Sequence, residues 1–141
     1  MTQEELKKIH EKYGEAFILL NKVEFLIEAF IRTECGFSSL NEKTANDILK
    51  RKTLGGKIEL AKPSFKNEKL TIELSSLVTK RNKLAHSWLT PFNHEGESFI
   101  ALIGDLKVEK IEDDFFTKLI DSCKTAIEMI ENEKRTPANN G

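Results

Sequence analysis

The sequence predicts a mainly α-helical protein, an antiparallel bundle of four to five helices with a small β-hairpin near residues 98–111. Apolar residues recur at three- and four-residue steps over residues 2–34, 67–88 and 112–134, which is the period of a helix with a buried face. The segment 98–111 instead carries two short apolar arms around a turn signal. A helix is the alternative for that segment.

Length and composition favour one folded domain. The chain has 141 residues, of which 39% are hydrophobic and 32% charged, so it resembles a globular rather than a disordered protein. We expect a single domain over residues 1–134 and a disordered tail over residues 135–141. No apolar run approaches the ~20 residues that cross a bilayer, and the first residues lack the pattern of a signal peptide. These features predict a cytoplasmic protein with no membrane partner.

The cysteines and glycines match no cofactor or metal motif. Cys35 and Cys123 fit no metal-binding spacing, and we expect reduced thiols, with a disulfide as the less favoured alternative. The Gly55-Gly56 pair lacks the GxxxxGK[ST] pattern of a phosphate-binding loop. HExxH and CxxC spacings are absent as well. We therefore expect neither a metal nor a cofactor.

The first helix is expected over residues 2–34, with Thr2 as a candidate cap and Gly36 as a stop. Its core stripe comprises Tyr13, Ala16, Phe17, Leu20, Val23, Ile27 and Phe30. Further apolar residues lie off this stripe: Ile18, Leu19, Phe25, Leu26 and Ile31. A helix that is apolar on more than one face is buried on more than one face, so it is either central or part of a subunit interface.

A line of polar residues also follows this helix: Asn21, Glu24, Glu28 and Arg32. We interpret the line as the solvent face, with Glu28 and Arg32 as a surface pair at i,i+4. The alternative is a polar strip directed at a functional site.

Shorter elements follow. Ser39 or Asn41 can cap a helix that runs to about Arg51, and Thr53 can cap another that ends at Pro63. Asn67 is a natural cap for the next long helix, which we expect to stop near residues 88–90, before Pro91.

The remaining segments are a loop, the hairpin and a last helix. We predict a loop over residues 92–97 and a hairpin that turns at Gly104-Asp105. Asp113 is a candidate cap for the last helix. Its predicted buried face comprises Phe116, Leu119, Ile120, Cys123, Ile127 and Ile130.

Charge is distributed unevenly although the net charge is only −1. Residues 43–86 hold 11 Lys and Arg against 4 Asp and Glu, which gives +7, whereas residues 1–42 sum to −3 and residues 87–141 to −5. A solvated face is the common explanation of such a run. A field that attracts a polyanion is the functional alternative.

The basic segment runs into Lys80-Arg81-Asn82-Lys83-Leu84-Ala85-His86-Ser87-Trp88. On a straight helix Arg81 and His86 would stand about 140° apart, whereas Asn82 and His86, at i and i+4, share one face. One helix therefore does not bring Arg81 and His86 to one small ligand. Either the helix loosens after Asn82, or two copies of the chain share the site.

Arginine and histidine together suit cleavage of a phosphodiester in RNA. An imidazole with an ordinary pKa of ~6.5 can accept the 2′-hydroxyl proton or donate one to the leaving oxygen. The guanidinium of Arg81 can stabilise charge on the phosphoryl group, and Asn82 can orient the phosphate or the imidazole of His86. Candidate RNA contacts are Lys80, Lys83, Arg51 and Lys57. A purely structural role is the alternative, in which Arg81 pairs with an acid such as Glu24.

The hexapeptide Arg81-Asn82-Lys83-Leu84-Ala85-His86 resembles the Arg-Asn-x-x-x-His form of the motif in HEPN domains, small helical domains common in bacterial toxin–antitoxin, abortive-infection and CRISPR-associated systems. A long first helix and Thr53-Leu54-Gly55 before the motif helix agree with a stand-alone bacterial HEPN protein over most of residues 2–90. The resemblance implies a metal-independent endoribonuclease that leaves a 2′,3′-cyclic phosphate. The catalytic residues would be Arg81 and His86, supported by Asn82, at a homodimer interface.

The resemblance also suggests a role in a toxin–antitoxin system or in phage defence, with RNA as substrate and an antitoxin protein as partner. One HEPN subgroup has a tyrosine two positions after the histidine, as the target of AMP transfer by its antitoxin. Here that position is Trp88, so this form of control is not expected. The alternative function is a non-catalytic helical module that dimerises or binds a partner protein or nucleotide.

Overall fold

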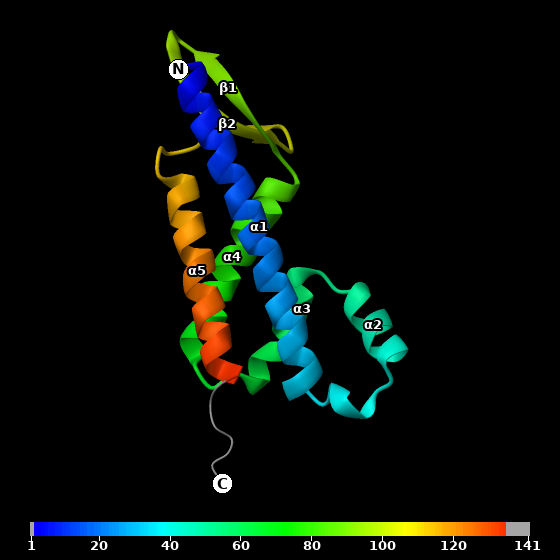
Figure 1. Ribbon diagram of the computed structural model, residues 1–141. Coiled ribbons are helices and arrows are strands. Elements are labelled where there is room, and N and C mark those ends of the chain that lie inside the picture. The colour runs from blue at the N-terminus through cyan, green and yellow to red at the C-terminus, as the bar shows by residue number, and fades with distance from the viewer. Residues whose placement is uncertain (1, 135–141) are drawn as a thin grey trace.

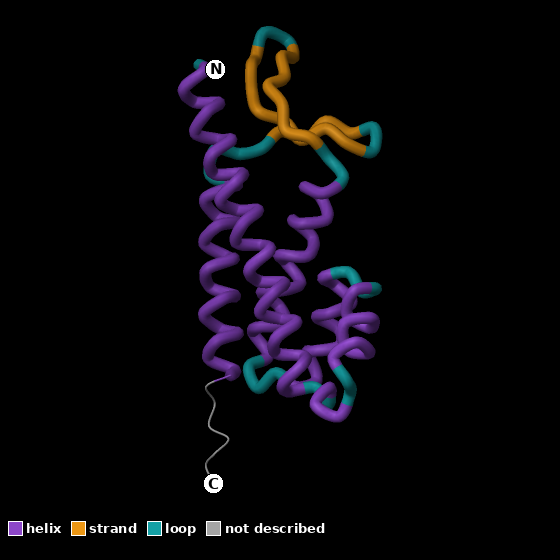
Figure 2. The backbone as a smooth tube through the Cα atoms, turned by 45° about the vertical axis from the view of Figure 1, so that its right-hand side comes forward, coloured by secondary structure: helices purple, strands orange, loops and turns teal. Residues whose placement is uncertain are grey.

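The computed structural model describes residues 2–134 and shows a helical bundle with a small sheet at one end (Figures 1 and 2). In chain order its elements are α1 (Gln3–Glu34), a 3₁₀ turn η1 (Phe37–Ser39), α2 (Glu42–Lys50), α3 (Leu54–Ala61), η2 (Lys62–Ser64), α4 (Glu68–Ala85), β1 (Trp88–His94), β2 (Glu97–Gly104), β3 (Lys107–Lys110) and α5 (Phe115–Lys134). The predicted fold class is thereby confirmed. The tail predicted for residues 135–141 lies outside the described residues.

Helix α1 is the central element, and α5, α3 and η1 all pack on it. Its start is fixed by Thr2, whose hydroxyl accepts the N–H of Glu5 at 3.1 Å while the Glu5 carboxylate accepts the N–H of Thr2 at 3.0 Å. Gly36 follows the helix with φ of 80°, a left-handed conformation that glycine adopts without strain. The buried residues of α1 are Ala16, Leu20, Val23, Ile27, Phe30 and Ile31.

The predicted caps and buried faces of the other helices are largely confirmed. Asn41, Thr53 and Asn67 cap α2, α3 and α4, because their side-chain oxygens accept backbone N–H groups of the first helical turn. The buried face of α5 contains all six residues that the helical period selects: Phe116, Leu119, Ile120, Cys123, Ile127 and Ile130. However, α5 begins at Phe115, two residues after the predicted cap Asp113.

The far end of α5 is tied to the start of α4. The buried carboxylate of Glu133 accepts the backbone N–H groups of Lys66 and Asn67 at 2.8 and 2.7 Å. These groups lie next to the α4 N-terminus, where a negative charge is favourable. Helix α4, which carries the motif, is thus held in register at its first turn.

The predicted end of α4 was wrong, because the helix stops at Ala85 and residues 88–94 form strand β1 instead of a helix end and a loop. The three strands make an antiparallel sheet in the order β1-β2-β3, with Trp88 opposite Ile103 and Gly104 opposite Lys107. Pro91, which has no N–H group to donate, is tolerated because β1 is an edge strand.

The hairpin predicted near 98–111 is confirmed, but its turn lies one residue later. Asp105 and Leu106 are the turn residues, with φ values of 50° and 64°, as a two-residue turn between twisted strands requires. Gly104, which was predicted to be in the turn, is the last residue of β2.

Candidate functional site

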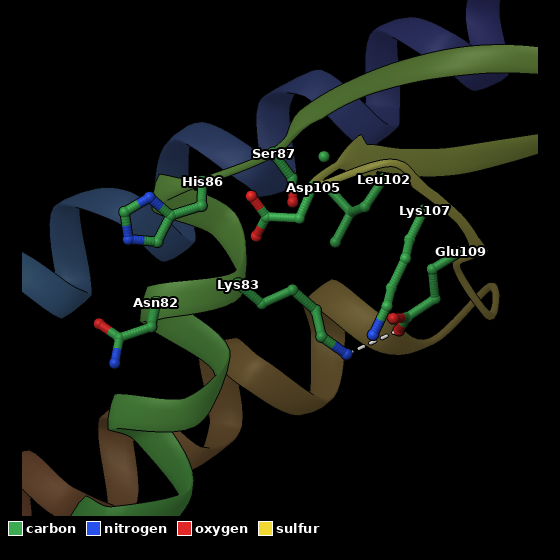
Figure 3. A pocket seen from close by; sticks show the side chains of 9 residues that line it. Asn82, Lys83, His86, Ser87, Leu102, Asp105, Lys107 and Glu109 are labelled. Atoms are coloured by element: carbon green, nitrogen blue, oxygen red, sulfur yellow. Dashed lines mark hydrogen bonds and ion pairs between the residues drawn. The ribbon is translucent and has the colours of Figure 1, made fainter.

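His86 lies where α4 gives way to the sheet. Its backbone has left the helical conformation (φ −106°, ψ 15°), and its N–H donates to the carbonyl oxygen of Asn82 at 3.2 Å. The helix is regular through Ala85 and ends just before the histidine, so it does not loosen directly after Asn82 as one of the two alternatives required. The side chains of Asn82 and His86 are exposed and lie on the same side of this helix end, as their spacing predicts (Figure 3).

A cavity of about 330 Å³ adjoins the two side chains. It lies between the end of α4 and the β2–β3 hairpin, and its lining comprises Asn82, Lys83, His86, Ser87, Leu102, Gly104, Asp105, Lys107 and Glu109. Lys83 and Glu109 form an ion pair at 2.7 Å across it. Figure 3 shows the carboxylate of Asp105 pointing across the open space toward the His86 side.

Gly104 holds the hairpin against the motif. A Cβ atom at this position would come within 2.3 Å of the backbone oxygen of His86 and 2.7 Å of the Ser87 hydroxyl, distances that no side chain could occupy. Only glycine permits this approach of β2 to the motif backbone. The following turn residue, Asp105, consequently lines the same cavity as His86.

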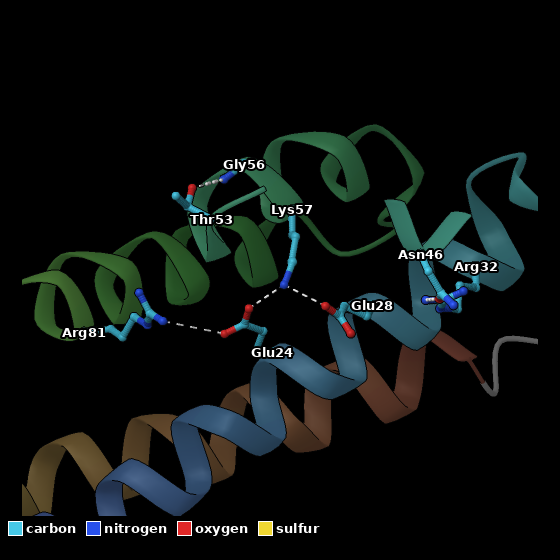
Figure 4. A network of polar contacts seen from close by, with 8 residues as sticks. All are labelled: Glu24, Glu28, Arg32, Asn46, Thr53, Gly56, Lys57 and Arg81. Atoms are coloured by element: carbon cyan, nitrogen blue, oxygen red, sulfur yellow. Dashed lines mark hydrogen bonds and ion pairs between the residues drawn. The ribbon is translucent and has the colours of Figure 1, made fainter. Parts of the chain in front are cut away.

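Arg81 lies elsewhere and does not line this cavity. Its guanidinium is 3.9 Å from the carboxylate of Glu24 on α1, and its side chain is 37% exposed (Figure 4). The pairing of Arg81 with Glu24, foreseen as the structural alternative, is present. Within one chain, therefore, Arg81 and His86 leave the same helix end toward different surroundings.

Glu24 belongs to a partly buried network of ion pairs, and this network contradicts two predictions from the sequence. Lys57 of α3 is only 4% exposed, and its amino group contacts the carboxylates of Glu24 at 2.5 Å and Glu28 at 2.6 Å. Arg32 bonds to Asn46 of α2 instead of Glu28. Three residues of the polar line, Glu24, Glu28 and Arg32, thus make inter-helix contacts, whereas Asn21 is exposed as predicted. Lys57 is buried in this network and does not present its amino group to RNA.

The charge of Lys57 is held by its partners. Burial lowers the pKa of its amino group, but the hydrogen bonds and negative charges of Glu24 and Glu28 outweigh burial, so the pKa lies above the ordinary 10.5. One lysine facing two carboxylates leaves a surplus negative charge in the network. That surplus favours a second cation, and Arg81 occupies this position.

The other predicted RNA contacts are scattered. Arg51 is exposed at the end of α2, and Lys83 is paired with Glu109. Lys80 lies close enough to α5 for its charge to lower the pKa of the Cys123 thiol, although burial raises that pKa overall. The structure therefore brings together Asn82, Lys83 and His86 but not Arg51, Lys57 or Lys80.

Helix α1 also exposes large apolar side chains. Phe17, Ile18 and Phe25 are 40%, 70% and 67% exposed, although Phe17 was predicted to be in the core stripe. Phe17 and Ile18 lie two helical turns before Glu24 and Phe25, and the exposed Asn21 and Lys22 lie between the two pairs. Large apolar side chains exposed on one side of a helix are candidates for an interaction surface.

The sequence predicted only part of these surroundings. Glu24 was a candidate partner of Arg81, but the polar line on α1 that also contains Glu28 was assigned to solvent. The β2–β3 hairpin that carries Asp105 and Lys107 was predicted, but its place against the motif was not, because that depends on the contact of Gly104 with His86 and Ser87.

Metal sites, membrane spans and relatives add no further constraint. Among residues 2–134 no group of three or more His, Cys, Asp and Glu side chains could hold a metal ion. None of the helices described has the length and apolar character that a bilayer crossing needs. No protein-family model matches the chain, nor does any curated protein or solved structure.

Proposed function

We propose that the protein is a metal-independent endoribonuclease, similar to HEPN ribonucleases, which acts as a homodimer through a site shared by two copies of the motif. The observation that carries this proposal is the disposition of the α4 end. Asn82 and His86 are exposed and free of side-chain partners among residues 2–134, whereas Arg81 projects to another side of the same helix end. A two-fold dimer can place Arg81 of one copy opposite His86 of the other.

The chemistry follows from the two side chains. His86 takes the proton of the ribose 2′-hydroxyl, and the 2′-oxygen attacks phosphorus. The bond from phosphorus to the 5′-oxygen breaks and water protonates that oxygen, so a 2′,3′-cyclic phosphate and a 5′-hydroxyl result. The hydroxide that remains takes the proton back from His86. Arg81 of the second copy stabilises the added negative charge on the phosphoryl oxygens, and Asn82 positions the phosphate by donating from its amide.

The apolar side of α1 supplies a surface for the dimer. Phe17, Ile18 and Phe25 would pack against their counterparts, and Glu24 lies at the border of this surface. Dimerisation there would therefore bring Arg81 to the interface.

Glu24 does not prevent this role of Arg81. An ion pair at 3.9 Å with a partly exposed guanidinium contributes ~1 kcal/mol or less. A phosphate that offers bidentate charged hydrogen bonds can replace it.

The first test measures RNA cleavage in EDTA by the wild type and by His86→Ala. His86 side-chain loss should reduce cleavage by about 100-fold or more, the lower range for loss of a general base. His94→Ala is the matched control, since His94 is also exposed but lies at the end of β1 away from the motif. It should cleave like the wild type.

Measuring the free energy of unfolding shows whether a variant loses cleavage because it lacks a catalytic group or because it is less stable. His86 has no side-chain partner among residues 2–134, and His94 has only exposed contacts with Phe92 and Glu95, so the two alanine variants should unfold within about 0.5 kcal/mol of the wild type. Equal cleavage by the wild type and His86→Ala would refute the proposal.

The ion-pair network favours one competing function, a non-catalytic module in which Arg81 only joins α4 to α1. That module predicts no RNA cleavage, and loss of stability or of partner binding in Arg81→Ala. Under the ribonuclease proposal, the biological setting is a cytoplasmic toxin–antitoxin or phage-defence system, with an antitoxin protein as its regulator.

A further inference from the structure

We propose that the cavity beside His86 binds a guanine base of single-stranded RNA, and that the carboxylate of Asp105 recognises it through the guanine N1–H and N2–H groups. This inference rests on the proposed ribonuclease function, because it assigns the base next to the phosphate that His86 acts on.

Two charged side chains of the cavity lining, one negative and one positive, can bind a ligand. Lys83 and Glu109 neutralise each other at 2.7 Å. The side chains of Asp105 and Lys107 form no hydrogen bond or ion pair with any other residue of the described chain. A ligand that offers both hydrogen-bond donors and a negative charge would satisfy both side chains.

The position of Asp105 is fixed by the backbone. Gly104 packs on the carbonyl of His86 so closely that no Cβ fits, and Asp105 follows in a tight turn with φ of 50°. Left-handed backbone is unusual outside glycine, although Asp and Asn adopt it more readily than other residues. The turn thus brings the carboxylate of Asp105 to the cavity.

Guanine fits this carboxylate better than the other bases do. Its Watson–Crick edge offers two adjacent donors, N1–H and the N2 amino group, which match the two oxygens of one carboxylate. Adenine, cytosine and uracil each place an acceptor beside their single donor position, and a carboxylate oxygen would repel that acceptor. Proteins read the Watson–Crick edges of unpaired RNA bases in this way.

The rest of the cavity suits a nucleotide. Its volume of about 330 Å³ lies at the lower end of the ~300–1,000 Å³ range of small-molecule sites. Leu102 is the apolar residue of the lining, and Lys107 contributes an ammonium group for a backbone phosphate. His86 borders the same cavity, so the bound base would be next to the reacting ribose.

The test measures binding of RNA that cannot be cleaved. Labelled 2′-O-methyl hexauridines carrying one guanine, one inosine or one adenine at the same position are titrated with wild-type protein by fluorescence anisotropy. The base of inosine, hypoxanthine, is guanine without the N2 amino group. We expect the guanine oligonucleotide to bind roughly 10- to 100-fold more tightly than the inosine one, the effect of one hydrogen bond to a charged group.

Asp105→Asn should abolish the preference. Asparagine keeps the size of the side chain and tolerates the positive φ, but its amide presents a donor to guanine donors. Glu109→Gln is the matched control, because Glu109 is a carboxylate of the same cavity that Lys83 already occupies. This control should keep the preference for guanine.

Each outcome decides the proposal separately from the ribonuclease function. Equal binding of guanine and inosine by the wild type, no binding, or a preference that survives Asp105→Asn would overturn it, even if His86-dependent cleavage is found. A guanine preference that depends on Asp105 in a protein that never cleaves RNA would support the base site and refute the ribonuclease.

Discussion

The role of a single residue in this protein depends on the residues that pack around it. Lys57 belongs to the most basic segment and lies in a short helix, so the sequence indicates a surface lysine. Its burial between Glu24 and Glu28 depends on how α3 packs on α1, which no local pattern specifies. The i,i+4 relation of Asn82 and His86, by contrast, depends on helix geometry alone and was predictable.

Cys123 provides a prediction at this scale. Burial raises the pKa of its thiol to about 11, opposed by the charge of Lys80 and reinforced by Glu73. Between pH 9 and 11 the unfolded thiol ionises while the folded thiol stays protonated, so the folded state loses stability as pH rises.

From pH 8 to pH 10.5 the wild type should therefore lose on the order of 2 kcal/mol more than Cys123→Ala in urea unfolding. The alanine variant, which is less stable at pH 8 because a cavity remains, serves as the reference for every other titrating group. Parallel pH profiles would show that the thiol ionises equally in both states.

At the scale of elements, the apolar periodicity of the sequence predicted the helices but missed strand β1. The helical period and the caps placed α1, α2, α3 and α5 within a few residues. The predicted end of α4 was too late because Trp88–His94 forms a strand that pairs with β2 across a two-residue turn at Glu95 and Gly96. Strand formation depends on cross-strand pairing and packing as much as on local propensity.

The β2–β3 turn provides the element-scale prediction. Leu106 has φ of 64° and a fully exposed side chain. The left-handed conformation costs a residue with a Cβ atom about 1–2 kcal/mol. Leu106→Gly should remove this strain and stabilise the protein by roughly 0.5 kcal/mol, after the greater freedom of glycine in the unfolded chain is included.

Leu106→Ala is the matched control for the turn, because alanine retains the Cβ and therefore the strain. The midpoint of urea unfolding should rise for the glycine variant and stay near the wild-type value for the alanine variant. An equal rise in both would attribute the effect to removal of an exposed apolar side chain.

At the scale of the whole molecule, the two main residues of the motif, Arg81 and His86, lie in different surroundings. The hairpin and its cavity adjoin His86, and α1 with its exposed Phe25 and Ile18 adjoins the side of Arg81. In the proposed dimer these two halves would face each other across the two-fold axis, so that each reaction site takes one half from each copy.

Such sharing predicts complementation between inactive variants. Arg81→Ala and His86→Ala should each cleave RNA poorly alone, because every shared site lacks one group. In an equimolar mixture about half of the dimers contain one copy of each variant, and one of their two sites regains both groups. The mixture should therefore recover up to roughly a quarter of wild-type cleavage.

A third substitution tests whether recovery needs the apolar side of α1. Adding Phe25→Glu to both variants places like charges across the proposed interface, which should block dimerisation and remove the recovered cleavage. Sedimentation of the mixture reports the dimer directly. A stable mixed dimer without recovered cleavage would mean that Arg81 and His86 act within one chain, and Arg81 would then have to leave Glu24 and reach the histidine around the end of α4.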